Sequence, residues 1–159
     1  MPTVQVDARN LQRALQDHFA TRRASLMKAT EEVAHRGVAH AVGLTNADGL
    51  VYLGAYKRGF KVVPPVGDRG AVLRNDTPYA AVTEWGRRPM RPGPPVAPIR
   101  EWVRLKLGLS GDELERATFL IRRHIHIHGS RPHLIMHRTY LQMKGWFKAE
   151  AERRLRAGI

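Results

Sequence analysis

The sequence predicts an α+β fold, in which a long N-terminal helix packs on a small antiparallel sheet and a proline-rich arm leads to C-terminal helices. Apolar residues at helical spacing near both ends, short apolar runs between turn residues over 44–86, and five prolines within 87–98 predict it. With 159 residues, 43% of them hydrophobic, the chain is long enough for a single domain with a buried core. We divide this domain into 1–40 (helix), 44–86 (sheet and turns), 87–98 (arm) and 99–159 (helices).

The N-terminal helix is predicted from Asp7 to about Arg36. Its inward positions recur at helical spacing: Leu11, Leu15, Phe19, Leu26, Ala29 and Val33. Asp7 is a suitable N-cap, with Val6 and Leu11 placed to form a hydrophobic staple across it. Gly37 and Gly43 are the expected stops.

Short strands are predicted next, at Leu50–Leu53, Phe60–Val63 and Ala71–Arg74. A turn at Asn46–Gly49 precedes the first strand, and the loop Pro64–Gly70 separates the other two. Strands this short need a helix over one face, and the N-terminal helix is the candidate.

The segment from Asn75 to Pro98 links the sheet to the C-terminal helices. It opens with Asn-Asp-Thr-Pro turn chemistry and continues as a compact apolar stretch, Tyr79–Trp85, which contains one acid, Glu84, and stops at Gly86. The prolines at 89, 92, 94, 95 and 98 then predict a stiff, extended, polyproline-like arm.

Two helices are predicted before residue 130. The first has Pro98 in its first turn, one apolar face made by Ile99, Trp102 and Val103, and its end at Gly108. Ser110 and Glu113 form a capping box that opens the second, which Gly129 ends. The second helix turns these residues inward: Leu114, Ala117, Ile121 and Ile125.

The last helix is predicted from His133 to Leu155. Its apolar side consists of Met136, Tyr140, Met143, Phe147 and Ala151. Arginines at 153, 154 and 156 suit the negative end of the helix dipole.

Charge is the strongest compositional feature. Twenty-seven Lys and Arg against 14 Asp and Glu give a net charge of +13, which favours a polyanionic neighbour, either nucleic acid or acidic protein. A generally arginine-rich proteome is the plainer explanation, and the basic residues are spread along the chain rather than gathered in one tail. Without cysteine there is neither a disulfide nor a thiolate metal site, and no apolar run or signal peptide predicts a membrane or secreted protein, so we expect a chain made in the cytoplasm.

No catalytic motif is present, so we expect no enzyme activity, cofactor or metal. The histidine run from His124 to His128 would align three histidines on a strand, but a helix aligns only His124 and His128, and a metal site usually needs a third ligand. Glu84 lacks a partner at catalytic spacing and is better explained as a cap or as an ion pair with Arg87 or Arg88. The tryptophans at 85, 102 and 146 suit a core better than base stacking.

The motif order resembles the small neck or tail-completion proteins of long-tailed bacteriophages, described as minor tail or head–tail connector proteins. The resemblance covers nearly the whole chain and is most specific over 75–132. It is carried by Asn75…Pro78-Tyr79-Ala80, Glu84-Trp85-Gly86-Arg87, Pro94-Pro95-Val96, Ile99…Trp102-Val103 and Gly129-Ser130-Arg131-Pro132. The histidine run and Leu134–Met136 depart from the family's pattern.

This resemblance implies a non-enzymatic virion protein of the neck or tail, assembled in the host cytoplasm as a ring, sixfold in symmetry. Its partners would be portal-side head-completion proteins, tail-tube or tail-terminator proteins, and packaged DNA in the channel. We expect the subunit contacts to involve Tyr79, Glu84, Trp85, Arg87, Arg88, Pro94 and Pro95. A closed ring leaves no free sheet edge, and a stiff arm suits contact with a neighbouring subunit.

Two alternatives belong to other classes. The net charge and the tryptophans suit a standalone basic nucleic-acid-binding protein, whose affinity would fall steeply with salt. A histidine-dependent metallonuclease is the third and weakest hypothesis.

Overall fold

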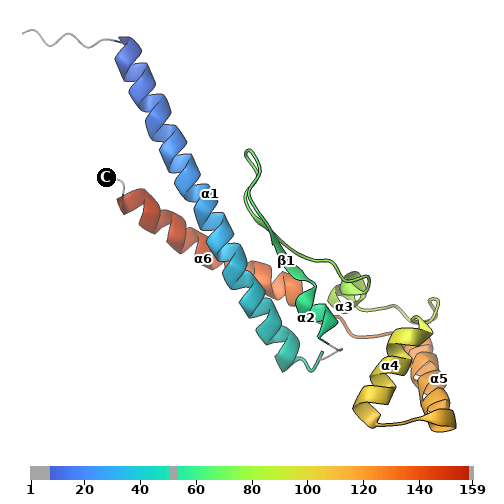
Figure 1. Cartoon of the computed structure of the whole chain (residues 1–159). Coiled ribbons are helices and arrows are strands. Elements are labelled where there is room, and N and C mark those ends of the chain that lie inside the picture. The colour runs from blue at the N-terminus through green and yellow to red at the C-terminus, as the bar shows by residue number, and fades with distance from the viewer. Residues whose placement is uncertain (1–7, 51–53, 158–159) are drawn as a thin grey trace, which may run out of the picture. The chain divides into compact units, whose positions relative to one another are not determined.

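The computed structural model describes residues 8–50 and 54–157, and it has the predicted α+β class (Figure 1). Helices dominate it. Their bounds are α1 Ala8–Ala47, α2 Ala55–Arg58, α3 Ala80–Trp85, α4 Val96–Leu107, α5 Gly111–His128 and α6 Ile135–Ala157. Two strands, β1 Phe60–Val63 and β2 Val72–Asn75, form an antiparallel hairpin.

The chain divides into two compact units, and α1 and α6 supply residues to both. One unit contains 1–38, 62–73 and 140–159, and the other contains 39–61 and 74–139. The capping and staple residues Val6 and Asp7, and residues Val51–Leu53 of the first predicted strand, lie outside the described residues.

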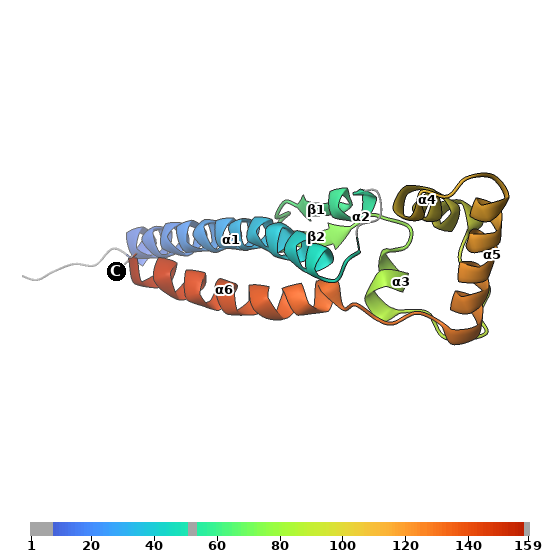
Figure 2. The same cartoon turned by 90° about the horizontal axis from the view of Figure 1, so that it is seen from below.

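In the first unit, α1 and α6 lie side by side and antiparallel, as both views show (Figures 1 and 2). Arg36 lies 4.5 Å from the centre of the Trp146 ring, and Arg154 reaches from α6 to the Glu32 carboxylate at 2.7 Å. The hairpin packs on the same helix, because the Ala71 amide donates to the Thr30 hydroxyl at 2.9 Å. The predicted helix over the sheet is therefore confirmed.

The expected stops at Gly37 and Gly43 are wrong, since α1 continues through both to Ala47. Gly37 is buried where the helices approach closely: a Cβ there would lie 2.5 Å from the Met143 sulfur and 3.2 Å from a Leu73 methyl. The glycine thus serves packing rather than termination. The turn expected at Asn46–Gly49 does follow the helix, and Gly49 adopts a positive φ of 68°.

These two glycines predict opposite mutational effects. Gly43→Ala meets nothing within 4 Å, so the gain in helix propensity should stabilise the chain by about 0.5–1 kcal/mol. Gly37→Ala makes the same change but pushes against Met143, and we expect it to destabilise. Urea unfolding of both variants measures the difference; stabilisation by both would contradict the close approach of α1, α6 and the hairpin.

In the second unit, α4 and α5 form a helical hairpin (Figure 1). Ile99, Val103 and Leu114 are buried between them, and the predicted inward residues Ala117, Ile121 and Ile125 pack against this core. Gly108 ends α4 in the left-handed region, and Gly129 ends α5, both as predicted. Ser110 does precede α5, but its side chain makes no capping hydrogen bond, so the capping box is wrong in its chemistry.

The inward face of α6 also differs from the prediction. Tyr140 is exposed, whereas Ile135 and Thr139 are fully buried. The Thr139 hydroxyl shares a hydrogen bond with Nδ1 of His40 on α1 at 3.4 Å. A threonine with a satisfied hydroxyl can occupy a core position, which rotates the buried face by one residue from the purely apolar one.

Candidate assembly surface

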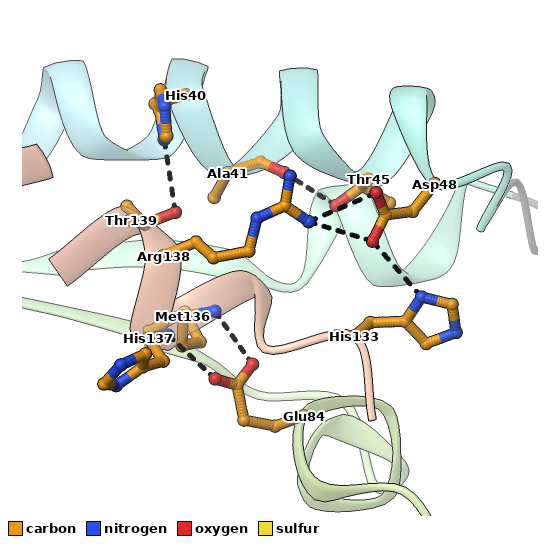
Figure 3. A network of polar contacts seen from close by, with 10 residues as sticks. All are labelled: His40, Ala41, Thr45, Asp48, Glu84, His133, Met136, His137, Arg138 and Thr139. Atoms are coloured by element: carbon orange, nitrogen blue, oxygen red, sulfur yellow. Dashed lines mark hydrogen bonds and ion pairs between the residues drawn. The ribbon is translucent and has the colours of Figure 1, made fainter. Parts of the chain in front are cut away.

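The carboxylate of Glu84 binds the beginning of α6. Glu84 lies on α3, is only 6% exposed, and accepts hydrogen bonds from the amides of Met136 at 2.8 Å and His137 at 2.7 Å (Figure 3). These amides belong to the first turn of α6, where backbone N–H groups lack partners within the helix. A carboxylate there also faces the positive end of the helix dipole. Glu84 is therefore a cap, as predicted, but the cap of a helix about fifty residues away in the sequence.

Two connectors cross directly beside this cap. Arg87 and Ser130 form an antiparallel bridge, with amide-to-carbonyl distances of 3.1 and 2.9 Å. Gly86 and Gly129 flank the bridge with φ of 71° and 76° and extended ψ, a region open essentially to glycine alone. A Cβ at either would meet the opposite backbone closer than 3.0 Å, so both glycines are required by contact as well as by conformation. We call this pair of connectors the Gly86–Gly129 crossing.

The proline-rich arm is fixed to α5 of the same chain, so the expectation of a free, continuously extended arm is wrong. The Met90 amide donates to the His126 carbonyl at 2.7 Å, His126 Nδ1 donates to the Arg91 carbonyl at 2.8 Å, and Arg122 Nε donates to the Pro94 carbonyl at 2.9 Å. Met90 adopts a positive φ of 60°, which turns the arm back toward α5. The prolines remove competing donors while α5 supplies the partners for the arm's carbonyls.

What this scaffold leaves exposed is apolar. On α3, Val82 and Trp85 lie one turn apart on one face, and Trp85 is 68% exposed; Met90, in the arm, is 70% exposed. We call Val82, Trp85 and Met90 the candidate assembly surface. Large apolar side chains that water contacts to this degree, on a backbone fixed by hydrogen bonds, are typical of protein interfaces.

The seven residues predicted at subunit contacts thus separate into classes. Trp85, Arg88 and Pro95 are exposed, and Pro94 is partly exposed. Glu84 is buried within its own chain and cannot contact a neighbour, which corrects its assignment to an interface; no ion pair joins it to Arg87 or Arg88 among the described contacts. Arg87 is half-buried, and its guanidinium donates to the Pro92 carbonyl within the arm.

Tyr79 is also mainly structural. Its ring stacks on Tyr56, with centroids 6.0 Å apart, and Tyr56 in turn contacts the edge of Phe60. Burial, followed by the nearby charge of Glu84, raises the pKa of Tyr56 to about 12. The turn below them follows the predicted chemistry, because the Asn75 side chain accepts from the Thr77 amide at 3.0 Å.

The histidine run does not gather a metal site. His124 and His128 share a face of α5, with ring centroids 4.5 Å apart, whereas His126 faces the arm. Across residues 8–50 and 54–157, no three His, Cys, Asp or Glu side chains are placed to hold a metal ion. This geometry is the helical one that the sequence favoured.

A polar cluster that the sequence did not reveal joins the end of α1 to α6. Asp48 accepts from Arg138 at 3.1 Å and from His133 Nδ1 at 3.2 Å (Figure 3). Burial alone would raise the pKa of Asp48, but hydrogen bonds from Arg138 and His133 outweigh it and leave the pKa below its usual value. The three residues are separated by more than eighty positions, so only the fold brings them together.

The lowered pKa of Asp48 predicts a pH effect. The stabilising contribution is complete above the unfolded-state pKa and is lost as pH falls through the folded-state value, from roughly pH 4 downward. Wild type should therefore lose more stability than Asp48→Asn on this descent, as measured by urea midpoints. Parallel pH profiles for the two proteins would show that the cluster contributes no linkage.

Sequence reasoning missed Val82 and Met90 on the candidate assembly surface. Val82 precedes Trp85 by three residues, a helical spacing that was available as a signal. Nothing local marks Met90, since its exposure follows from a left-handed turn that α5 stabilises across the chain.

Comparisons with protein-family models, with curated proteins and with solved structures found no match to this chain. Among the described helices, none combines the length and the apolar character that crossing a bilayer requires.

Proposed function

We propose that this chain is a structural ring component of a bacteriophage neck, which completes the tail or joins it to the head. The single observation that supports this most is the distribution of apolar side chains. Among the described residues, large apolar side chains that are exposed outnumber those that are buried, and they recur on α1, α3, α4, α5 and α6. A chain with so much uncovered apolar surface gains stability from association.

The scaffold around α3 supports the same proposal. The Glu84 cap and the Gly86–Gly129 crossing fix the backbone that carries Trp85, so little ordering is needed when this surface meets a partner. These two features also account for the motif pairing Glu84-Trp85-Gly86 with Gly129-Ser130, on which the family resemblance rests.

Sedimentation velocity and electron microscopy test the proposal. The chain should form closed rings, sixfold by the resemblance, either alone or with a portal or tail-tube complex, and antibodies against it should label the head–tail junction of purified particles. Trp85→Ser should prevent ring formation without unfolding, because Trp85 is 68% exposed. Phe119→Ser is the matched control on α5. A persistent monomer in the presence of both complexes, or particles that lack the chain, would refute the proposal.

A standalone nucleic-acid-binding protein is the second candidate, favoured by the net charge of +13. It requires tight binding to duplex or single strands that weakens by about a thousandfold or more between 50 and 200 mM salt. The same purified protein serves both tests, and weak, salt-insensitive binding would remove this candidate.

A further inference from the structure

The N-terminal part of α1 is uncovered. Every residue from Ala8 to Thr21 is exposed, and burial begins only at Arg22 and becomes complete at Ala29. Arg22 lies level with the end of α6, since its guanidinium donates to the Leu155 carbonyl at 3.1 Å. A helical segment of this length is marginal in water unless packing supports it.

Leu11, Leu15 and Phe19 form an apolar line on this segment, which we call the N-terminal stripe. The three residues are four apart and share a face, and Phe19 is 67% exposed. Further along α1 the same face carries Leu26, Ala29 and Val33, at the level where α6 runs beside it. The stripe therefore continues a surface that already accepts a helix within the chain.

The shape of the stripe favours a protein over a membrane. Polar side chains border it closely, with Gln12, Gln16 and His18 among the neighbouring positions. A line one residue wide suits the groove of a facing helix, whereas a helix that lies in a bilayer interface needs a broad apolar face.

Charge favours an acidic partner over a second copy of the segment. Arginines stand at 9, 13, 22 and 23, and Asp17 is the single acid between Ala8 and Arg23. Two such segments side by side would bring like charges within about a helix diameter, comparable to the Debye length of roughly 8 Å. An acidic surface would gain instead, in both affinity and association rate.

We propose that the N-terminal stripe docks on an acidic, apolar helical surface of another protein. The docked helix would extend the line of α6, covering Leu11, Leu15 and Phe19, and its acids would meet the surrounding arginines. This inference does not require ring formation, because it concerns a different part of the chain from the candidate assembly surface.

The test uses the full chain and two labelled helical peptides, each with a leucine line, flanked by glutamates in one and by lysines in the other. Fluorescence anisotropy should show at least tenfold tighter binding of the glutamate peptide, weakened by salt. The variant Leu11→Gln/Leu15→Gln/Phe19→Gln should lose at least tenfold in this affinity. The variant Phe119→Gln/Leu120→Gln, which removes exposed apolar residues from α5, should keep it.

Four outcomes would overturn the proposal. Equal affinity for both peptides would remove the role of charge, and unchanged binding by the triple variant would place the contact elsewhere. Binding to phosphatidylglycerol vesicles, but not to the glutamate peptide, would assign the stripe to a membrane. Self-association that the triple variant abolishes would identify a second copy as the occupant.

Discussion

Gly129→Ala should destabilise the protein by about 3 kcal/mol or more. Gly129 combines φ 76° with ψ −163°, which only glycine adopts readily, and an added Cβ would collide with the Arg87 carbonyl oxygen. The obstacle is backbone held in a bridge, so no side-chain rotation can relieve it. Chemical denaturation followed by circular dichroism measures the loss.

Gly108→Ala is the matched control. Gly108 also has a positive φ, 67°, but an added Cβ there meets nothing within 4 Å. The control should cost about 1–2 kcal/mol for the left-handed conformation alone. Equal losses in the two variants would mean that the connectors do not approach each other as closely as the structure places them.

The crossing shows where sequence reasoning reached its limit. Gly86 and Gly129 were each recognisable as local stops, and both do end helices. Their mutual contact was not recognisable, because no periodicity or turn preference relates positions more than forty residues apart. Glu84 is similar: its type and apolar setting indicated a cap, but not that the capped helix was α6.

Local signals succeeded where the responsible interaction is local. The starts of α4 and α5 and the ends at Gly108 and Gly129 follow from backbone preferences of Pro, Ser and Gly. The same reasoning failed at Gly37, where close packing against α6 outweighs a helix propensity penalty of about 1 kcal/mol. It failed at Thr139 because apolar periodicity cannot show that a hydroxyl is satisfied by a distant histidine.

The second large effect is expected at Glu84. Glu84→Ala should destabilise by about 2–4 kcal/mol, since it leaves the amides of Met136 and His137 without their acceptor at a buried helix start. Glu84→Gln retains one carbonyl oxygen and turns an NH₂ group toward the other amide, so its cost should be intermediate. Urea unfolding of both variants gives the two values.

Glu101→Gln serves as the control for loss of a carboxylate. Glu101 is paired with Arg104 on the surface of α4, an interaction worth about 0.5 kcal/mol or less. Hydrogen exchange separates a cap from a general charge effect, because removal of Glu84 should speed exchange in the first turn of α6 while α4 and α5 stay protected. Unchanged exchange at Met136 and His137 would show that another group binds these amides. If the expected pattern holds, Glu84 acts on assembly only through the backbone that it fixes, and Trp85 beside it is the residue that contacts a neighbour.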